Sequence, residues 1–175
     1  AIIRRSVNLS KESHVVAANL DRAFLVATVS HPPTSTGFID RFLVTAEAYG
    51  IPTTVVFNKC DIAENDPADA ETLDYMAQLY RMAGYDVLQV SATTGAGLPA
   101  LKLAIANAGV NMLSGHSGVG KTTLINELLP GLELRTGDVS ASHQKGKHTT
   151  TYAEMFPLPS GGYLIDTPGI KGFGL

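Results

Sequence analysis

Residues 115–122 read GHSGVGKT, and this stretch decides the fold. It has the form G-x-x-x-x-G-K-[ST], whose glycines let backbone N–H groups converge on the oxygens of a phosphate. The apolar residues 110–113 before it predict a buried strand, and residues 121–129 after it predict a helix. Because a phosphate loop lies between a strand and a helix, the stretch predicts a phosphate-binding site. The alternative is a glycine-rich helix start that binds nothing.

Two side chains at the end of this stretch carry chemistry. Lys121 can reach the β- and γ-phosphates of a nucleotide, and Thr122 can offer its hydroxyl to Mg²⁺. Lys121 is also a candidate catalytic residue, because phosphoryl transfer depends on neutralising charge. We count Thr123, the next residue, with the nucleotide contacts.

A second motif, NKCD at residues 58–61, comes earlier in the chain. It follows the predicted strand 53–57, so it lies at the carboxyl edge of the sheet, where open α/β sheets bind ligands. Asp61 can accept hydrogen bonds from N1–H and the 2-amino group of guanine, and adenine offers neither donor in that arrangement. Asn58 would connect the base to neighbouring loops, and the Lys59 stem can lie along the purine face. The alternative is an ordinary strand-to-helix turn.

Two further loops fit a nucleotide site. Ser91 and Ala92 follow the predicted strand 87–90, and we expect the Ala92 N–H to contact guanine O6 while Ser91 braces the loop. By itself this loop is equally consistent with a common strand-exit turn. Asp166 begins the sequence DTPG after the predicted strand 163–165. We expect Asp166 to hold Mg²⁺ through water and the Gly169 N–H to reach the γ-phosphate.

The rest of the chain alternates short apolar runs with segments of helical spacing. Buried strands are expected at residues 15–18, 24–29, 53–57, 87–90 and 110–113, and helices at 37–49, 68–83 and 98–108. One face of the second helix is predicted to carry Leu73, Met76, Leu79 and Tyr80. Residues 150–156 and 163–165 predict a hairpin that makes one sheet edge antiparallel. The fold class is therefore α/β, a three-layer phosphate-loop NTPase fold with a mainly parallel sheet and helices on both faces.

Composition narrows the partners and the location. The 175 residues are enough for one well-cored domain. A formal charge of -3 gives no bulk reason to bind nucleic acid or an anionic membrane, so contact with RNA needs a local patch. The single cysteine, Cys60, excludes an internal disulfide and fits a reducing compartment. No apolar run approaches the roughly 20 residues that span a bilayer, and we expect a soluble, cytoplasmic monomer.

Together, the base motif, second base loop, phosphate loop, threonine run and Asp-x-x-Gly, in that order, resemble the circularly permuted GTPases. In other GTPases the phosphate loop precedes the base motif. Residues 115–121 and 147–151 are similar to the ribosome small-subunit-dependent GTPase A family of bacteria. That resemblance implies a GTP hydrolase that binds GTP or GDP with Mg²⁺. It also implies action with the 30S subunit and its rRNA in late maturation, and stimulation by that subunit.

The resemblance also implies a domain organisation. Members carry an N-terminal oligonucleotide-binding barrel and a C-terminal zinc module, and we expect both to be absent from this chain. Residues 1–13 are then a linker from the missing barrel, and residues 14–175 are the circularly permuted GTPase domain. The single cysteine and five scattered histidines assemble no zinc-ligand cluster by spacing.

Residues 146–151 read GKHTTT and match the first switch segment of such GTPases. We favour Thr150 over Thr149 as the Mg²⁺ and γ-phosphate ligand. Many GTPases place a water-orienting Gln directly after Asp-x-x-Gly, but this chain has Ile170. An aliphatic side chain cannot orient water, so we expect slow turnover without a partner and name His148 as the replacement. The alternative is that His148 is a solvated loop imidazole.

Three function classes remain open: a GTPase, a nucleotide-dependent binding switch with negligible hydrolysis, and an ATP-using phosphate-loop protein. Asp61 and the Ser91–Ala92 loop oppose the third. The candidate catalytic residues are His148, Thr150 and Lys121, and the candidate Mg²⁺ ligands are Thr122, Thr150 and, through water, Asp166. The candidate nucleotide contacts are Asn58, Lys59, Asp61, Ser91, Ala92, Gly115, His116, Ser117, Gly118, Val119, Gly120, Lys121, Thr122, Thr123, Asp166 and Gly169.

Overall fold

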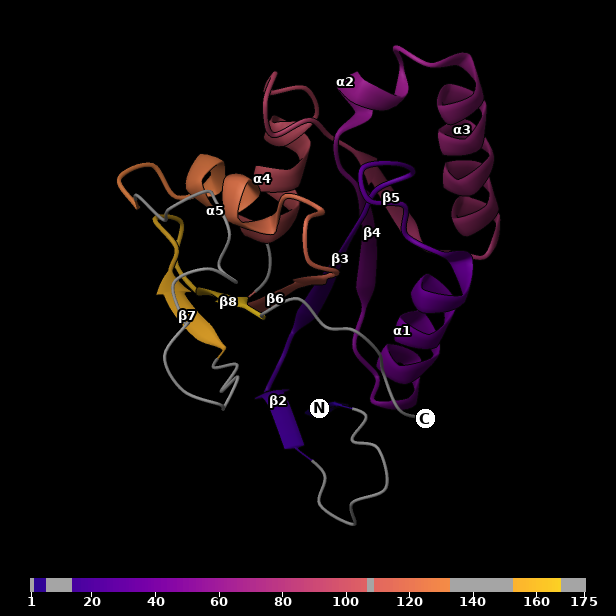
Figure 1. Ribbon diagram of the computed structural model, residues 1–175. Coiled ribbons are helices and arrows are strands. Elements are labelled where there is room, and N and C mark those ends of the chain that lie inside the picture. Colours follow the sequence, from indigo (N-terminus) through magenta and orange to yellow (C-terminus); the bar gives the residue numbers. More distant parts are fainter. Residues whose placement is uncertain (1, 6–13, 107–108, 133–152, 168–175) are drawn as a thin grey trace, which may run out of the picture.

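The computed structural model describes residues 2–5, 14–106, 109–132 and 153–167, with side chains from residue 17 onward. Within these residues a six-stranded sheet has the order β5-β4-β3-β6-β8-β7 (Figure 1). Its strands are β3 (Arg22–Ala27), β4 (Thr53–Phe57), β5 (Asp86–Gln89), β6 (Val110–Gly115), β7 (Glu154–Pro157) and β8 (Tyr163–Asp166). All neighbouring strands are parallel except β7, which pairs antiparallel with β8 at one edge.

Helices cover both faces of this sheet. They are α1 (Thr36–Ala48), α2 (Cys60–Ala63), α3 (Pro67–Met82), α4 (Leu98–Ala106) and α5 (Lys121–Leu128). Helices α1 and α3 lie on one side of the sheet and α4 and α5 on the other (Figure 1). Along β3, Leu25 packs in a core with α1 and α3, while Phe24 and Val26 pack in a second core with α4 and α5. Successive side chains of a strand point to opposite faces, so a strand covered on both sides is mostly apolar. This explains the continuous apolar runs at residues 23–27 of β3 and 55–57 of β4.

The chain leaves the neighbouring strands β3 and β6 in opposite directions along the sheet. From β3 the chain crosses through α1 to β4, whereas from β6 it passes through α5 to β7 and β8 on the other side. In open α/β sheets the ligand crevice lies outside the carboxyl ends of the strands at such a switch point. The phosphate loop follows β6 directly, so the topology places it at this crevice.

The predicted fold class is confirmed, and so is the antiparallel edge. Predicted elements differ from the observed ones by a few residues at their ends, and β4 has the predicted bounds. Of the predicted strand 150–156, residues 150–152 lie outside the described residues. Neither β1 (Ile2–Arg5) nor the short helix α2 was expected.

Two predicted elements pack differently from expectation. The strand expected at residues 15–18 forms, but β2 (His14–Ala18) pairs antiparallel with β1 in a separate two-stranded sheet and does not join the main sheet. Leu79 does not face the core and is 39% exposed. Leu73, Met76, Ala77 and Tyr80 form the buried stripe of α3. At 100° per residue Leu79 lies about 120° around the helix from Leu73, which places it beyond the stripe.

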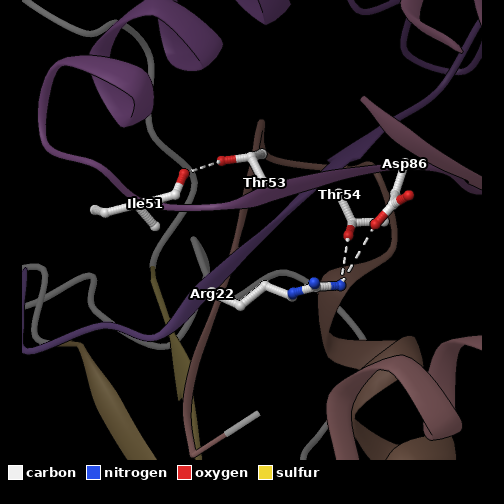
Figure 2. Close-up of polar contacts among 5 residues, drawn as sticks. All are labelled: Arg22, Ile51, Thr53, Thr54 and Asp86. Carbon is white, nitrogen blue, oxygen red and sulfur yellow. Dashed lines mark hydrogen bonds and ion pairs between the residues drawn. The ribbon is translucent and has the colours of Figure 1, made fainter. Parts of the chain in front are cut away.

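A polar cluster links three parallel strands at their amino ends, opposite the phosphate loop. Arg22 Nη1 lies 3.6 Å from Asp86 Oδ2 and 3.5 Å from Thr54 Oγ1, as Figure 2 shows. Thr53 Oγ1 donates to the carbonyl of Ile51 at 3.2 Å in the same view. Asp86 is 73% exposed, so the ion pair contributes no more than about 1 kcal/mol. The cluster therefore connects the amino ends of β3, β4 and β5 without supplying much stability.

No helix among the described residues is long and apolar enough to span a bilayer. In the same part of the chain, no three His, Cys, Asp or Glu side chains are grouped as metal ligands.

Candidate nucleotide site

The phosphate loop connects β6 to α5 through two glycines that no other residue could replace without strain. A Cβ on Gly115 would lie 2.4 Å from the carbonyl oxygen of Val26 on the neighbouring strand. Gly120 precedes α5 with φ +91°, a left-handed conformation that side chains disfavour. The backbone can therefore approach β3 closely and then turn sharply into the helix, which leaves its N–H groups at the switch point.

Lys121 is a buried cation held by this loop. Its Nζ donates to the carbonyl oxygens of Gly115 and His116, both at 2.8 Å. An ammonium group has three donors, so these two bonds leave one for a phosphate oxygen. Burial lowers the pKa of Lys121 to about 8, and the nearby Asp166 opposes that shift. The loop therefore presents a positive charge in an environment where it has little water to stabilise it.

Asp166 supplies the opposite charge from the end of β8. Burial raises its pKa to about 6, Lys121 opposes the shift, and Glu154 adds to it. Its Oδ1 is buried and has no hydrogen-bond partner among the residues that the structure describes. An orphaned carboxylate oxygen beside a phosphate loop fits a Mg²⁺ ion with its water shell, since Mg²⁺ prefers oxygen ligands and keeps several waters. Thr122, in the first turn of α5, would be the hydroxyl ligand.

Asn58 joins three loops. Its Nδ2 donates to the carbonyl of Val119 in the phosphate loop at 2.9 Å, and its Oδ1 accepts from the Ala92 N–H at 3.2 Å. The side chain is 3% exposed, so both bonds are shielded from water. The Ala92 N–H, expected at guanine O6, is thus already bound to Asn58. Contact with a base would require a shared hydrogen bond. In the same loop the Ser91 Oγ accepts from the Thr94 N–H at 3.1 Å.

Lys59 ties the base motif to the phosphate loop and to a third segment. It has φ +62°, and its Nζ donates to the carbonyl of Gly118 at 2.8 Å and to the carbonyl of His31. Burial lowers the pKa of Lys59, and Asp61 opposes that shift. Asp61 lies in the first turn of α2 and is part-exposed. Cys60 is buried, and burial raises its pKa to about 11, so its thiol stays protonated at neutral pH.

The family of this chain follows from comparison with known proteins. The model of the RsgA GTPase family matches residues 1–175. The chain belongs to the RsgA GTPase family. Small ribosomal subunit biogenesis GTPase RsgA of Bacteroides fragilis is 56% identical over 173 residues, which cover 99% of this chain and 55% of that protein. RsgA 2 of Bacteroides thetaiotaomicron is 54% identical over the same share of both chains.

Solved structures of similar proteins agree with this RsgA assignment. YjeQ from Thermotoga maritima superimposes with a TM-score of 0.71 and 35% identity, over 95% of this chain and 51% of that one. YloQ, described as a circularly permuted GTPase, gives a TM-score of 0.65 and 26% identity, over 99% of this chain and 57% of that one. The permuted fold is thereby confirmed. The chain spans about half the length of the RsgA relatives it matches.

The structure of this RsgA-family chain brings most of the predicted nucleotide contacts to one edge of the sheet. His148, Thr150 and Gly169 lie outside the described residues. Two contributors were missed, namely His31, whose carbonyl binds Lys59, and Phe38, whose ring lies on His116. His31 lies in the loop between β3 and α1, and Phe38 lies in the first turn of α1. Neither stretch carries a motif, so only its position after a strand at the carboxyl edge signalled a role.

A methyl group at Gly120 should disrupt the candidate nucleotide site. Its Cβ would lie 2.5 Å from Asn58 Nδ2, so Gly120→Ala pushes Asn58 off the Val119 carbonyl besides straining the backbone. We expect fluorescent GDP to bind at least about tenfold more weakly, as for the loss of a buried hydrogen bond plus backbone strain. Gly131→Ala is the matched control, since Gly131 has φ +101° with nothing within 4 Å of its Cβ position. An equal loss of GDP affinity in Gly120→Ala and Gly131→Ala would contradict a role for the contact between Asn58 and Val119.

Proposed function

We propose that this chain binds GTP with Mg²⁺ and hydrolyses it to GDP and phosphate. The observation that supports the proposal is the double hydrogen bond of Asn58, which joins the NKCD turn to the phosphate loop and to the Ser91–Ala92 loop. A base site and a phosphate site joined by one buried side chain fit a single ligand that has both groups. Asp61, at the start of α2, then selects guanine over adenine.

The described residues supply charge and position for the hydrolysis. Lys121 neutralises negative charge on the β- and γ-phosphates, while backbone N–H groups from Ser117 to Thr122 line the phosphate chain. Asp166, with its orphaned Oδ1, and Thr122 would hold Mg²⁺, which withdraws charge from the phosphate oxygens when bound. In this proposal Thr150 completes the Mg²⁺ ligands.

Two further roles in the reaction belong to residues outside the described part of the chain. The Gly169 N–H contacts the γ-phosphate, and His148 orients the attacking water when a partner closes the first switch segment. Because Ile170 stands in place of a water-orienting Gln, turnover without that partner is slow.

The partner in this proposal is the small ribosomal subunit with its rRNA, in the bacterial cytoplasm. The RsgA relatives from the two Bacteroides species are named for biogenesis of that subunit. The formal charge of -3 gives no general attraction to RNA, so contact with rRNA would need a local patch or another domain. The protein acts as a monomer in this proposal.

Asp61→Ala tests the base site. In competition against fluorescent GDP with Mg²⁺, we expect GDP and GTP, but not ATP, to displace the probe from the wild-type protein. The variant should lose this preference, because it has no carboxylate to accept from guanine N1–H and the 2-amino group, the two donors that adenine does not offer. Glu64→Ala is the control, since Glu64 is an exposed carboxylate at the end of the same short helix. Equal competition by ATP in the wild type would contradict the proposal.

A further inference from the structure

The phosphate loop contacts helix α1 through two rings. The His116 imidazole lies on the Phe38 ring, with centroids 3.7 Å apart and planes inclined by 33°. Phe38 is 1% exposed and lies in the first turn of α1. A part-buried loop side chain is thereby held by a ring that is itself fixed in the core.

The stacked residue also holds Lys121. The carbonyl oxygens of Gly115 and His116 each accept from Lys121 Nζ at 2.8 Å. The His116 side chain and carbonyl share one Cα, so a ring fixed against Phe38 restricts rotation of the peptide that carries this carbonyl. If the His116 ring were released, the His116 carbonyl could rotate, and the Lys121 ammonium group would no longer be held in its present orientation.

The first turn of α1, which carries Phe38, is held in place on both sides of the contact with His116. The Ser35 hydroxyl caps the helix by accepting from the Phe38 N–H at 3.3 Å. Lys59 links the loop before Ser35 to the phosphate loop, because its Nζ donates to the carbonyls of both His31 and Gly118. A Cβ on Gly118 would lie 3.2 Å from the Pro32 ring. The segment from β3 to α1 therefore touches the phosphate loop at two points.

We propose that Phe38 is a positioning residue, which acts through the His116 ring to aim Lys121 at the terminal phosphates. This inference rests on the proposed function, since it concerns how the same site handles GTP. Phe38 touches neither the nucleotide nor the reacting atoms in this proposal. Its effect passes through His116 and Lys121 alone, and so it should vanish when His116 is absent.

The charges around His116 agree with a neutral, stacking ring. Burial lowers the pKa of His116, and the positive charges of Lys121 and Arg41 lower it further. An uncharged imidazole can lie beside Lys121 without repelling it, and it stacks on an apolar ring at little desolvation cost. Arg41 is the charged residue on α1 that faces His116, and Lys121 is the one on α5.

A double-mutant cycle tests the proposal. Fluorescent GTP and GDP are titrated with Mg²⁺ against wild type, Phe38→Leu, His116→Ala and the double variant of the purified protein. Each single variant is expected to weaken GTP binding about two- to tenfold more than GDP binding, as for loss of one aromatic pair. Phe38→Leu should add no further loss in the His116→Ala background. Losses that multiply in the double variant would overturn the proposal.

Two more variants separate positioning from general destabilisation. His116→Phe retains a stacking ring and should recover part of the GTP-to-GDP affinity ratio that His116→Ala loses. Equal loss in both would overturn the proposal, even if Phe38→Leu did not fold. Phe24→Leu removes the same atoms from the core on the opposite face of the sheet, and it should leave the ratio unchanged. A wild type that binds neither guanine nucleotide would contradict the proposed function, whereas wild-type binding with independent losses would contradict only the role of Phe38.

Discussion

Lys121→Met is expected to lower kcat/KM for GTP about a hundred- to a thousandfold. The side chain keeps its length but loses the charge that neutralises the phosphates and the two bonds that it donates to Gly115 and His116. Loss of one preorganised charge donor at a water-excluded site has an effect of this size. Phosphate release under steady-state conditions with Mg²⁺ is the measurement. Lys102→Met, an exposed position on α4, is the control.

We also expect the affinity for guanine nucleotides to depend on pH through Lys121. With a pKa of about 8 in the free protein, Lys121 loses its proton as the pH rises through that value. The affinity of the wild type for guanine nucleotides should therefore fall above about pH 8, because the neutral amine no longer attracts phosphate. Lys121→Met should lack this fall. A variant with hydrolysis within tenfold of wild type would remove Lys121 from the mechanism.

The sequence predicted where the candidate site residues lie wherever they belong to a short contiguous pattern. The phosphate loop and Asp166 are such cases, because their spacing to a strand end places them at the carboxyl edge of the sheet. The predicted link from Asn58 to neighbouring loops matches its bonds to Val119 and Ala92. Its proposed contact with the base stays a prediction.

Features set by distant packing could not be predicted in the same way. The contact of Phe38 with His116 joins positions far apart in the chain, and the Phe38 spacing only indicates a buried helix face. The apolar run at residues 15–18 shows that a strand forms there but not which strand it pairs with, and β1 takes that place. Leu79 was misplaced because it lies about 120° around the helix from Leu73, outside the stripe that Leu73, Met76 and Tyr80 form with Ala77.

We expect the two buried charges, Lys121 and Asp166, to favour a nucleotide complex at the expense of the free protein. Burial shifts the pKa of Lys121 downward and that of Asp166 upward, so the folded chain disfavours the charged form of each, despite their attraction. Phosphate and Mg²⁺ would relieve both costs when they bind, since each supplies the opposite charge. At this site, activity is therefore expected to come at the cost of stability of the free protein. Removing one of the two charges should raise that stability and lower the activity.

Asp166→Asn is expected to stabilise the nucleotide-free, Mg²⁺-free protein near neutral pH while it abolishes Mg²⁺-dependent hydrolysis. The folded-state pKa of about 6 lies above the ordinary value of 3.8, so the contribution of Asp166 to stability is fully present below about pH 4. It is lost as the pH rises through about 6, and by about pH 7 the cost is on the order of 3 kcal/mol. Urea unfolding with EDTA at about pH 5 and about pH 7 should show the advantage of the variant growing with pH. Asp74→Asn, exposed on α3, controls for loss of a carboxylate. An advantage that shrinks with rising pH would show that the Asp166 carboxylate is stabilised in the free protein, contrary to its burial and its orphaned Oδ1.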